Sequence, residues 1–182
     1  MKLIILDRDG VINEDSDLYI KSVAEWRPLK GAAEAIARFN HAGYRVVVAT
    51  NQSGIGRGLF DMATLNAMHG KMHKVVAQAG GRIDAVFYCP HKDDDKCACR
   101  KPKPGMLLDI AQRFNVDLKR VPCVGDAVRD LQAGAQVGCE LALVKTGKGL
   151  RTLAAAGLPQ GALPEAVQVY DDLAAVAAHY CT

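Results

Sequence analysis

The sequence has 182 residues, of which 49% are hydrophobic, and carries a formal net charge of +3 at pH 7. This length and apolar content are typical of one domain with a full core, and the charge is too small to imply a nucleic-acid partner. No apolar stretch approaches the ~18–20 residues of a membrane span, and the N-terminus has no signal-peptide pattern. We therefore expect residues 1–182 to form a single domain of a cytoplasmic monomer that does not bind a membrane.

The first apolar run, residues 3–6, predicts a buried strand that ends in Asp7, Arg8, Asp9 and Gly10. Residues two apart in extended backbone point to the same side, so Asp7 and Asp9 are expected to face one site. Two such acids repel each other and need a cation or a raised pKa. This pattern indicates a metal-assisted reaction, and the alternative is an Asp-rich turn in which Gly10 makes the bend.

Further apolar runs alternate with segments of helical spacing. Helical faces are expected within residues 32–39, 65–76 and 106–114, and strands at 44–49, 85–88, 121–124, 141–144 and 167–170. This order predicts an α/β fold, a central parallel sheet covered by helices on both faces. The spacing leaves no room for a large cap domain, and residues 147–164 are interpreted as a long surface connection.

Polar residues follow several of these strands, where ligands of such sheets bind. Thr50, Asn51, Gln52 and Ser53 follow the second run, and Asp126 and Asp130 follow the fourth. Three of the acids, Asp7, Asp9 and Asp126, are suited to one Mg²⁺ ion. Each residue also has an ordinary structural interpretation. Thr50 to Ser53 can cap a helix or make a turn, Asp126 can be an N-cap, and Lys101 can be a solvated charge.

The order of Asp7-x-Asp9-Gly10, Thr50, Lys101 and Gly125-Asp126-x3-Asp130 resembles the four motifs of the haloacid dehalogenase superfamily. The resemblance implies a Rossmann-like three-layer sandwich and an aspartyl-phosphate intermediate on Asp7. Asp9 would protonate the leaving oxygen and then activate water. Thr50 and Lys101 would stabilise the phosphoryl group. Asp7, Asp126 and the backbone carbonyl of Asp9 would hold Mg²⁺. The second Asp favours a phosphatase, because an alkoxide leaving group needs a proton.

A second cluster precedes Lys101. Cys89, His91, Cys97 and Cys99 offer three thiolates and one imidazole, the closed donor set of a structural Zn²⁺ site. Scattered free thiols are the alternative, because the spacing is not that of a usual zinc finger. A zinc loop over residues 89–99 would fix the backbone that presents Arg100 and Lys101. We expect an open site whose rim is formed by residues 14–22 and 89–99.

These features resemble the capless, zinc-loop phosphatases of the superfamily, and residues 51–58 and 97–106 favour a sugar bisphosphate as substrate. By resemblance, Arg100 would recognise the substrate, with Asp15, Asn51, Gln52 and Ser53 positioning it. Ala127 departs from the pattern, in which Lys often follows Gly-Asp. The alternatives are a phosphatase of histidinol phosphate and, in another class, a zinc-stabilised nucleic-acid-binding module.

Overall fold

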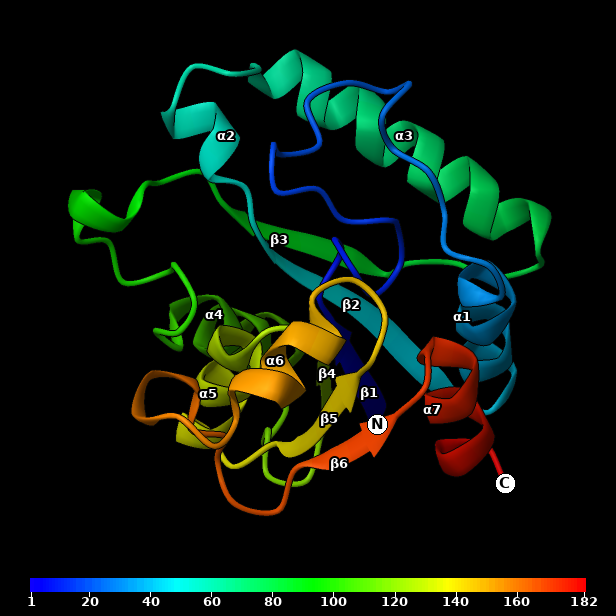
Figure 1. Cartoon of the computed structure of the whole chain (residues 1–182). Coiled ribbons are helices and arrows are strands. Elements are labelled where there is room, and N and C mark those ends of the chain that lie inside the picture. Colours follow the sequence, from blue (N-terminus) through cyan, green and yellow to red (C-terminus); the bar gives the residue numbers. More distant parts are fainter.

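The computed structural model describes residues 1–182, apart from the side chain of Gln160. In this described part, six strands form one parallel sheet in the order β3-β2-β1-β4-β5-β6 (Figure 1). The predicted strands are confirmed, and their bounds shift by at most two residues. The strands are β1 Lys2–Leu6, β2 Tyr44–Asn51, β3 Ala85–Cys89, β4 Pro122–Gly125, β5 Glu140–Val144 and β6 Gln168–Tyr170.

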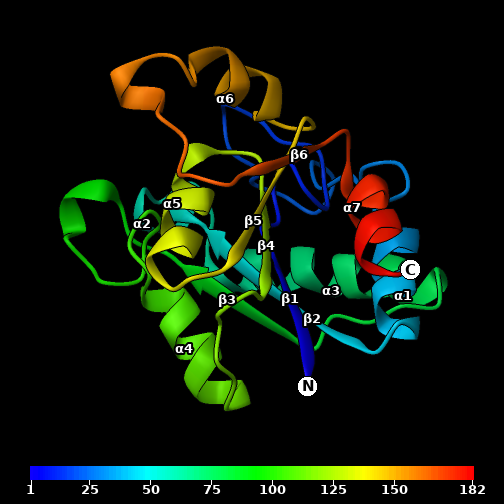
Figure 2. The ribbon, with the colours of Figure 1, turned by 90° about the horizontal axis from the view of Figure 1, so that it is seen from below.

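Helices cover both faces of the sheet, as Figure 2 shows from a second direction. One face carries α1 (Ala32–His41), α3 (Met62–Gln78) and α7 (Leu173–Tyr180), and the other carries α4 (Gly105–Phe114) and α5 (Val128–Gln136). The short helices α2 (Ser53–Gly56) and α6 (Gly149–Ala155) lie in connections that follow β2 and β5. The predicted three-layer α/β fold is therefore confirmed.

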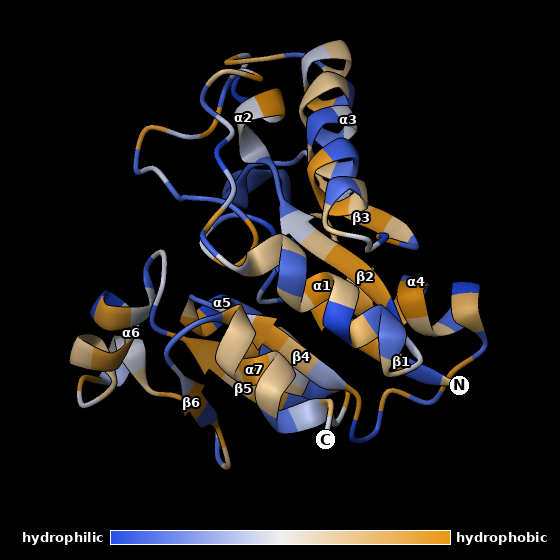
Figure 3. Ribbon diagram, turned by 90° about the vertical axis from the view of Figure 1, so that its right-hand side faces the viewer, coloured by the Kyte–Doolittle hydropathy of each residue, from blue (hydrophilic) through white to orange (hydrophobic). Residues whose placement is uncertain are grey.

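Side-chain alternation along β1 sorts the core between these two faces. Ile4 and Leu6 pack in the cluster that contains Phe39, whereas Leu3 and Ile5 pack in the cluster that contains Ile110. This is the two-residue period expected of a strand that is buried on both sides. The hydropathy colouring of Figure 3 accordingly shows apolar colour along β1, β2, β4 and β5.

The sheet brings the ends of β1 and β4 together at the point where the strand order reverses. Leu6 pairs with Val124, and the Asp7 amide donates to the Val124 carbonyl over 2.9 Å. Asp7 follows β1 and Asp126 follows β4, so both acids lie at the edge where α/β sheets bind ligands. Gly10 turns the chain away with φ of +83°, and a Cβ there would lie 2.0 Å from Asp126 Oδ2. Gly10 therefore makes the bend that the alternative interpretation of this segment expects.

Two features of the connections bear on the sequence-based expectations. The interpretation of residues 147–164 as a surface connection was incomplete, because they contain α6 and a 3-10 turn at Pro159–Gly161. Within the described residues, no large domain interrupts the sheet. A search of the same residues finds no helix with the length and apolar character needed to cross a membrane.

Candidate active site

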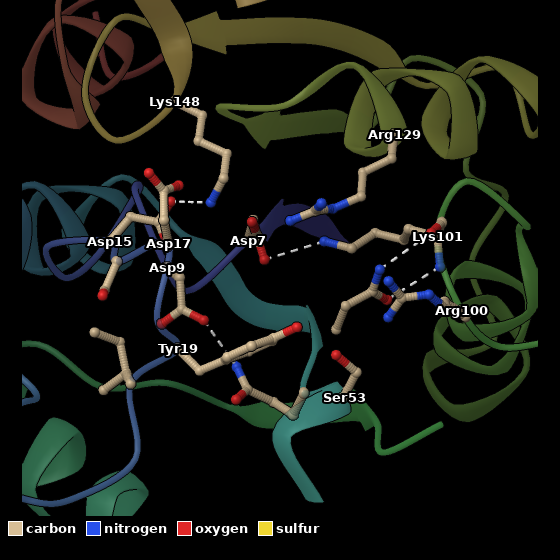
Figure 4. Close-up of a pocket in the computed structure, with 14 residues that line it drawn as sticks. Asp7, Asp9, Asp15, Asp17, Tyr19, Ser53, Arg100, Lys101, Arg129 and Lys148 are labelled. Carbon is tan, nitrogen blue, oxygen red and sulfur yellow. Dashed lines mark hydrogen bonds and ion pairs between the residues drawn. The ribbon is translucent and has the colours of Figure 1, made fainter. Parts of the chain in front are cut away.

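A cavity opens at the carboxyl edge of the sheet, and Figure 4 shows the side chains that line it. Residues from the loops after β1, β2, β4 and β5 meet here, together with the segment before α4. The predicted residues in the lining are Asp7, Asp9, Asp15, Asn51, Gln52, Ser53, Arg100 and Lys101. Residues 15–20 form part of the rim, as expected, whereas the 89–99 loop lies beside the cavity and reaches it through Arg100 and Lys101.

Lys101 lies at the centre of this site. Its side chain is only 4% exposed, and its Nζ lies 3.0 Å from Asp7 Oδ1 and 2.8 Å from Asp130 Oδ1. The same ammonium donates to the Ala49 carbonyl over 2.7 Å. Burial opposes the charge, but the carboxylates of Asp130 and Asp7 outweigh it and raise the pKa of Lys101. The alternative that Lys101 is a solvated surface charge is therefore wrong.

The buried carboxylates of Asp7, Asp126 and Asp130 form an acidic cluster, with oxygen atoms within 4.8 Å of one another. Burial, followed by the charge of Asp130, raises the pKa of Asp7 to about 6 and that of Asp126 to about 8. Carboxylates that repel each other in this way are stabilised by a cation. The donor set suits a hard ion such as Mg²⁺.

Asp130 has a different role from the other two acids. Its Oδ2 accepts from the Ala127 amide over 3.1 Å, and Lys101 neutralises its charge. Burial raises the pKa of Asp130, but the charges of Lys101 and Arg129 lower it by more, so that the net shift is downward. Asp126 is not the N-cap of α5, since that position is Ala127. Asp7 and Asp126 are therefore the acids best placed to hold a metal ion.

The carboxylate of Asp9 also lines the cavity but is held by a separate set of donors. Arg8 and Asn13 donate to Oδ1, and Gln52 donates to Oδ2 over 3.0 Å. Burial raises the pKa of Asp9, but the charge of Arg8 and these hydrogen bonds lower it further, so that the net shift is downward. Asp9 is therefore poised as an ionised base in this arrangement.

The residues after β2 support the site in several ways. The Asn51 side chain accepts from the Lys101 amide and donates to the Lys101 carbonyl, each over 3.0 Å. Thr50 is 1% exposed, and its hydroxyl accepts from Gln52 Nε2 over 2.9 Å. The amide of Asn51 is thus used to position Lys101, and the interpretation of Thr50 to Ser53 as a simple cap omits these contacts.

The predicted substrate residues Asp15 and Arg100 each have an ion-pair partner. Asp15 pairs with Lys148, and Arg100 pairs with Asp93 and also approaches the His91 carbonyl at 3.4 Å. The first pair joins the loop after β1 to the loop after β5. The second pair joins the cavity to the cysteine loop. Both pairs place a charged side chain on the wall of the cavity.

Sequence reasoning missed Arg129 and Lys148, which also line the cavity, and did not single out Tyr19 within the expected rim at residues 14–22 (Figure 4). Lys148 follows β5, so inspection of the fifth strand end would have found it. Arg129 lies three residues after Asp126, and neighbouring carboxylates, led by Asp130, outweigh its burial and raise its pKa. Tyr19 gives no sequence signal, although its φ of 66° marks an unusual backbone for a residue other than glycine.

The four predicted zinc ligands lie together in the loop before Arg100. Sulfur–sulfur distances from Cys89 are 3.6 Å to Cys97 and 3.1 Å to Cys99, and His91 Nδ1 lies 3.4 Å from Cys99 Sγ. Donors around one tetrahedral Zn²⁺ lie roughly 3.5–3.8 Å apart, as calculated from bond lengths of about 2.0–2.3 Å. Although burial acts in the other direction, hydrogen bonds from the Arg100 amide and neighbouring thiols lower the pKa of Cys97 to about 6. The donor set therefore fits zinc.

Comparison with known proteins agrees with this site. Residues 98–176 match the HAD-hydrolase-like family model. The chain is 62% identical over 177 residues to D-glycero-beta-D-manno-heptose-1,7-bisphosphate 7-phosphatase of Bordetella bronchiseptica, covering 97% of this chain and 96% of the relative. The enzyme of the same name from Pseudomonas aeruginosa is 55% identical over 175 residues, covering 96% and 95%.

Solved structures show the same relationship. The crystal structure of D,D-heptose 1,7-bisphosphate phosphatase from B. bronchiseptica, complexed with magnesium and phosphate, is 61% identical with a TM-score of 0.94, covering 98% of this chain and 97% of that one. The homologous structure from Burkholderia thailandensis is 55% identical with a TM-score of 0.79, covering 100% and 99%.

The fold and the site thus define a haloacid dehalogenase-like hydrolase, in agreement with the resemblance found in the sequence. Within that class, the chain belongs to the family of D-glycero-beta-D-manno-heptose-1,7-bisphosphate 7-phosphatases. This relationship favours an enzyme over the alternative of a nucleic-acid-binding module.

Asp126→Asn tests the acidic cluster. An unfolded Asp ionises near pH 3.8, whereas folded Asp126 keeps its proton up to about pH 8. The folded state without Mg²⁺ therefore loses stability as pH rises from about 4 to 8. We expect Asp126→Asn to raise the Tm at pH 8 without Mg²⁺ by at least about 2–4 °C, the shift for about 1 kcal/mol, and to abolish stabilisation by Mg²⁺. The exposed control Asp109→Asn should change neither quantity, and a lower Tm for Asp126→Asn would contradict the assignment.

Proposed function

We propose that this chain hydrolyses the 7-phosphate of D-glycero-beta-D-manno-heptose 1,7-bisphosphate and leaves heptose 1-phosphate. The observation that carries the proposal is the placement of Asp7, which lies between the Lys101 ammonium and Asp126 in a chain 62% identical to an enzyme of that name. The reaction would belong to ADP- or GDP-heptose and lipopolysaccharide-core biosynthesis.

We assign a role to each residue from the resemblance to haloacid dehalogenase phosphatases, and the contacts of Asp7 and Lys101 support this assignment. Asp7 attacks phosphorus and forms an aspartyl-phosphate, which water then hydrolyses. Lys101, buried 3.0 Å from Asp7, neutralises charge on the transferring phosphoryl oxygens. Thr50 contributes its hydroxyl to the same oxygens. When the phosphate binds, its negative charge favours the protonated form of Asp9. Asp9 then gives its proton to the leaving oxygen and takes one from the attacking water.

Two metal ions complete the proposed enzyme. Asp7, Asp126 and the Asp9 carbonyl would hold Mg²⁺, which supplies positive charge to the phosphoryl group when bound. Cys89, His91, Cys97 and Cys99 would hold Zn²⁺ with no open position for catalysis. Thiolate ligands of this kind persist in a reducing compartment, which supports a cytoplasmic location.

The remaining substrate contacts follow from the lining of the cavity. Arg100 would bind the second phosphate, with Asp15, Asn51, Gln52 and Ser53 shaping the space between the phosphates. We further propose that residues 1–182 are a single phosphatase domain with a zinc loop at 89–99. We also propose that the chain works as a monomer.

Substrate competition tests the proposal. The kcat/KM for release of the 7-phosphate from heptose bisphosphate should exceed that for histidinol phosphate by at least about tenfold, since the second phosphate adds a charge-assisted contact. The α and β anomers of the heptose bisphosphate at C1 are both assayed. Faster turnover of histidinol phosphate would overturn the choice of substrate but leave the phosphatase assignment in place.

Asp7→Asn tests the nucleophile. An amide cannot form the acyl phosphate, so turnover should fall to background while substrate binding in the presence of Mg²⁺ stays measurable by calorimetry. Trapping of labelled phosphate on the wild-type chain, and not on Asp7→Asn, provides the direct measurement. Retained turnover by the variant would refute the assignment.

Cys97→Ser tests the zinc loop. We expect the variant to lose zinc, measured by atomic emission, and its activity to fall by about 10- to 100-fold because Arg100 and Lys101 are less well positioned. The requirement for Mg²⁺ should remain. Cys139→Ser, outside the cluster, is the control and should retain zinc. A zinc-free variant with full activity would show that the loop has another role.

A further inference from the structure

Arg8, between the two acids of the first motif, has its side chain fully buried. Its Nε and Nη2 donate to the same oxygen, Asp9 Oδ1, over 3.0 and 2.8 Å. The cavity lining contains Asp7 and Asp9 but not Arg8, so the Arg8 side chain lies behind the cavity wall. A buried guanidinium needs hydrogen-bond acceptors for its N–H groups. Asp9 accepts from Nε and Nη2 of Arg8, so Nη1 needs another acceptor.

The other side of the guanidinium is satisfied by His69 of α3. Arg8 Nη1 lies 3.1 Å from His69 Nε2, and His69 is 9% exposed. Arginine only donates, so Nε2 is the acceptor and the ring is neutral with its proton on Nδ1. Burial, with the charges of Arg8 and His73, lowers the pKa of His69 to about 4, which agrees with a neutral ring.

The chain of contacts from His69 through Arg8 determines how the Asp9 carboxylate is turned. Oδ1 accepts from Arg8 twice and from Asn13 over 2.9 Å, whereas Oδ2 accepts from Gln52 alone in the contacts found among the described residues. Gln52 lines the cavity, so Oδ2 is the oxygen on the cavity side. Oδ2 is therefore the atom with capacity left for a proton.

We propose that His69 is a positioning residue for proton transfer, acting through Arg8 to present Oδ2 of Asp9 to the leaving oxygen. The proposal rests on the proposed function, in which an Asp7 oxygen bonds to phosphorus and the ester P–O bond breaks. The bonding electron pair passes to the leaving oxygen, which takes the proton that Asp9 Oδ2 carries in the substrate complex, and Asp9 is left as a carboxylate. Without the acceptor at 69, Arg8 is free to turn and the orientation of Asp9 is lost.

A positioning role of His69 in proton transfer predicts that the loss of rate depends on the leaving group of the ester. A role in the stability of the fold predicts the same loss for every ester. An alkoxide from glycerol phosphate needs the proton, whereas the phenolate from p-nitrophenyl phosphate leaves without it. In single-turnover experiments, His69→Leu should slow aspartyl-phosphate formation from glycerol phosphate by about 10- to 100-fold. Aspartyl-phosphate formation from the nitrophenyl ester should slow by less than about threefold, because protonation of this leaving group contributes little to the rate.

Conservative variants make the experiment specific. The Gln carbonyl in His69→Gln can reach the place of Nε2 and should restore the wild-type ratio of the two rates. The shorter Asn in His69→Asn should behave as Leu does. This pair also decides the matter if His69→Leu does not fold. Met72→Ala removes a buried side chain of the same helix without a polar contact, so it should lower the Tm while the ratio of rates stays unchanged.

Equal slowing of both esters by His69→Leu would overturn the proposal, as would the same altered ratio in Met72→Ala or identical ratios for His69→Gln and His69→Asn. Neither ester is the heptose bisphosphate, so an error in the assigned substrate leaves this result unaffected. Failure of the nucleophile assignment would instead appear as the absence of labelled aspartyl-phosphate from the wild-type enzyme.

Discussion

The site depends on the burial of one ammonium group between two carboxylates. Lys101 comes from the segment after the cysteine loop, Asp7 directly follows β1 and Asp130 lies in α5, so the contacts of Lys101 join three parts of the chain. In a low-dielectric interior such a charge is tolerated only with partners, and removal of one partner of a buried pair typically costs about 3–5 kcal/mol. Lys101 and the carboxylates of Asp7 and Asp130 therefore each favour the ionised form of the other partner.

The aspartates of the site differ in their hydrogen-bond and ion-pair partners, and their pKa values differ accordingly. Asp130 is bound by Lys101 and by the Ala127 amide, and therefore supports the others. Asp7 and Asp126 retain raised pKa values of about 6 and about 8, which marks them as the pair in need of a metal ion. Asp9, with its lowered pKa, is turned and held by Arg8, Asn13 and Gln52. In the mechanism that we propose, one residue type would thus supply a nucleophile, a metal ligand, a proton carrier and a support.

The strands of the sheet and several residues of the site could be predicted from the sequence, for reasons that particular residues show. β1 and β2 contain the uninterrupted apolar runs Leu3–Leu6 and Val46–Ala49 because both faces of the sheet are covered, so the existence and order of the two strands could be predicted directly. Asp7 and Asp126 were found because ligand sites follow strand ends. Lys148 lies in the connection between β5 and α6, where its spacing does not distinguish it from a surface lysine. Tyr19 lies in a loop without periodicity, where spacing carries no information.

The sequence by itself determined the order of strands and helices, the chemistry-bearing residues and the two donor sets, because these depend on local periodicity and residue type. Only the tertiary structure decided which partner each charge has. It showed that Asn51 binds the Lys101 backbone, that Asp15 pairs with Lys148, and that His69 reaches Arg8 from 61 residues away. Such pairings depend on distances in space between residues far apart in the chain, and no local pattern encodes them.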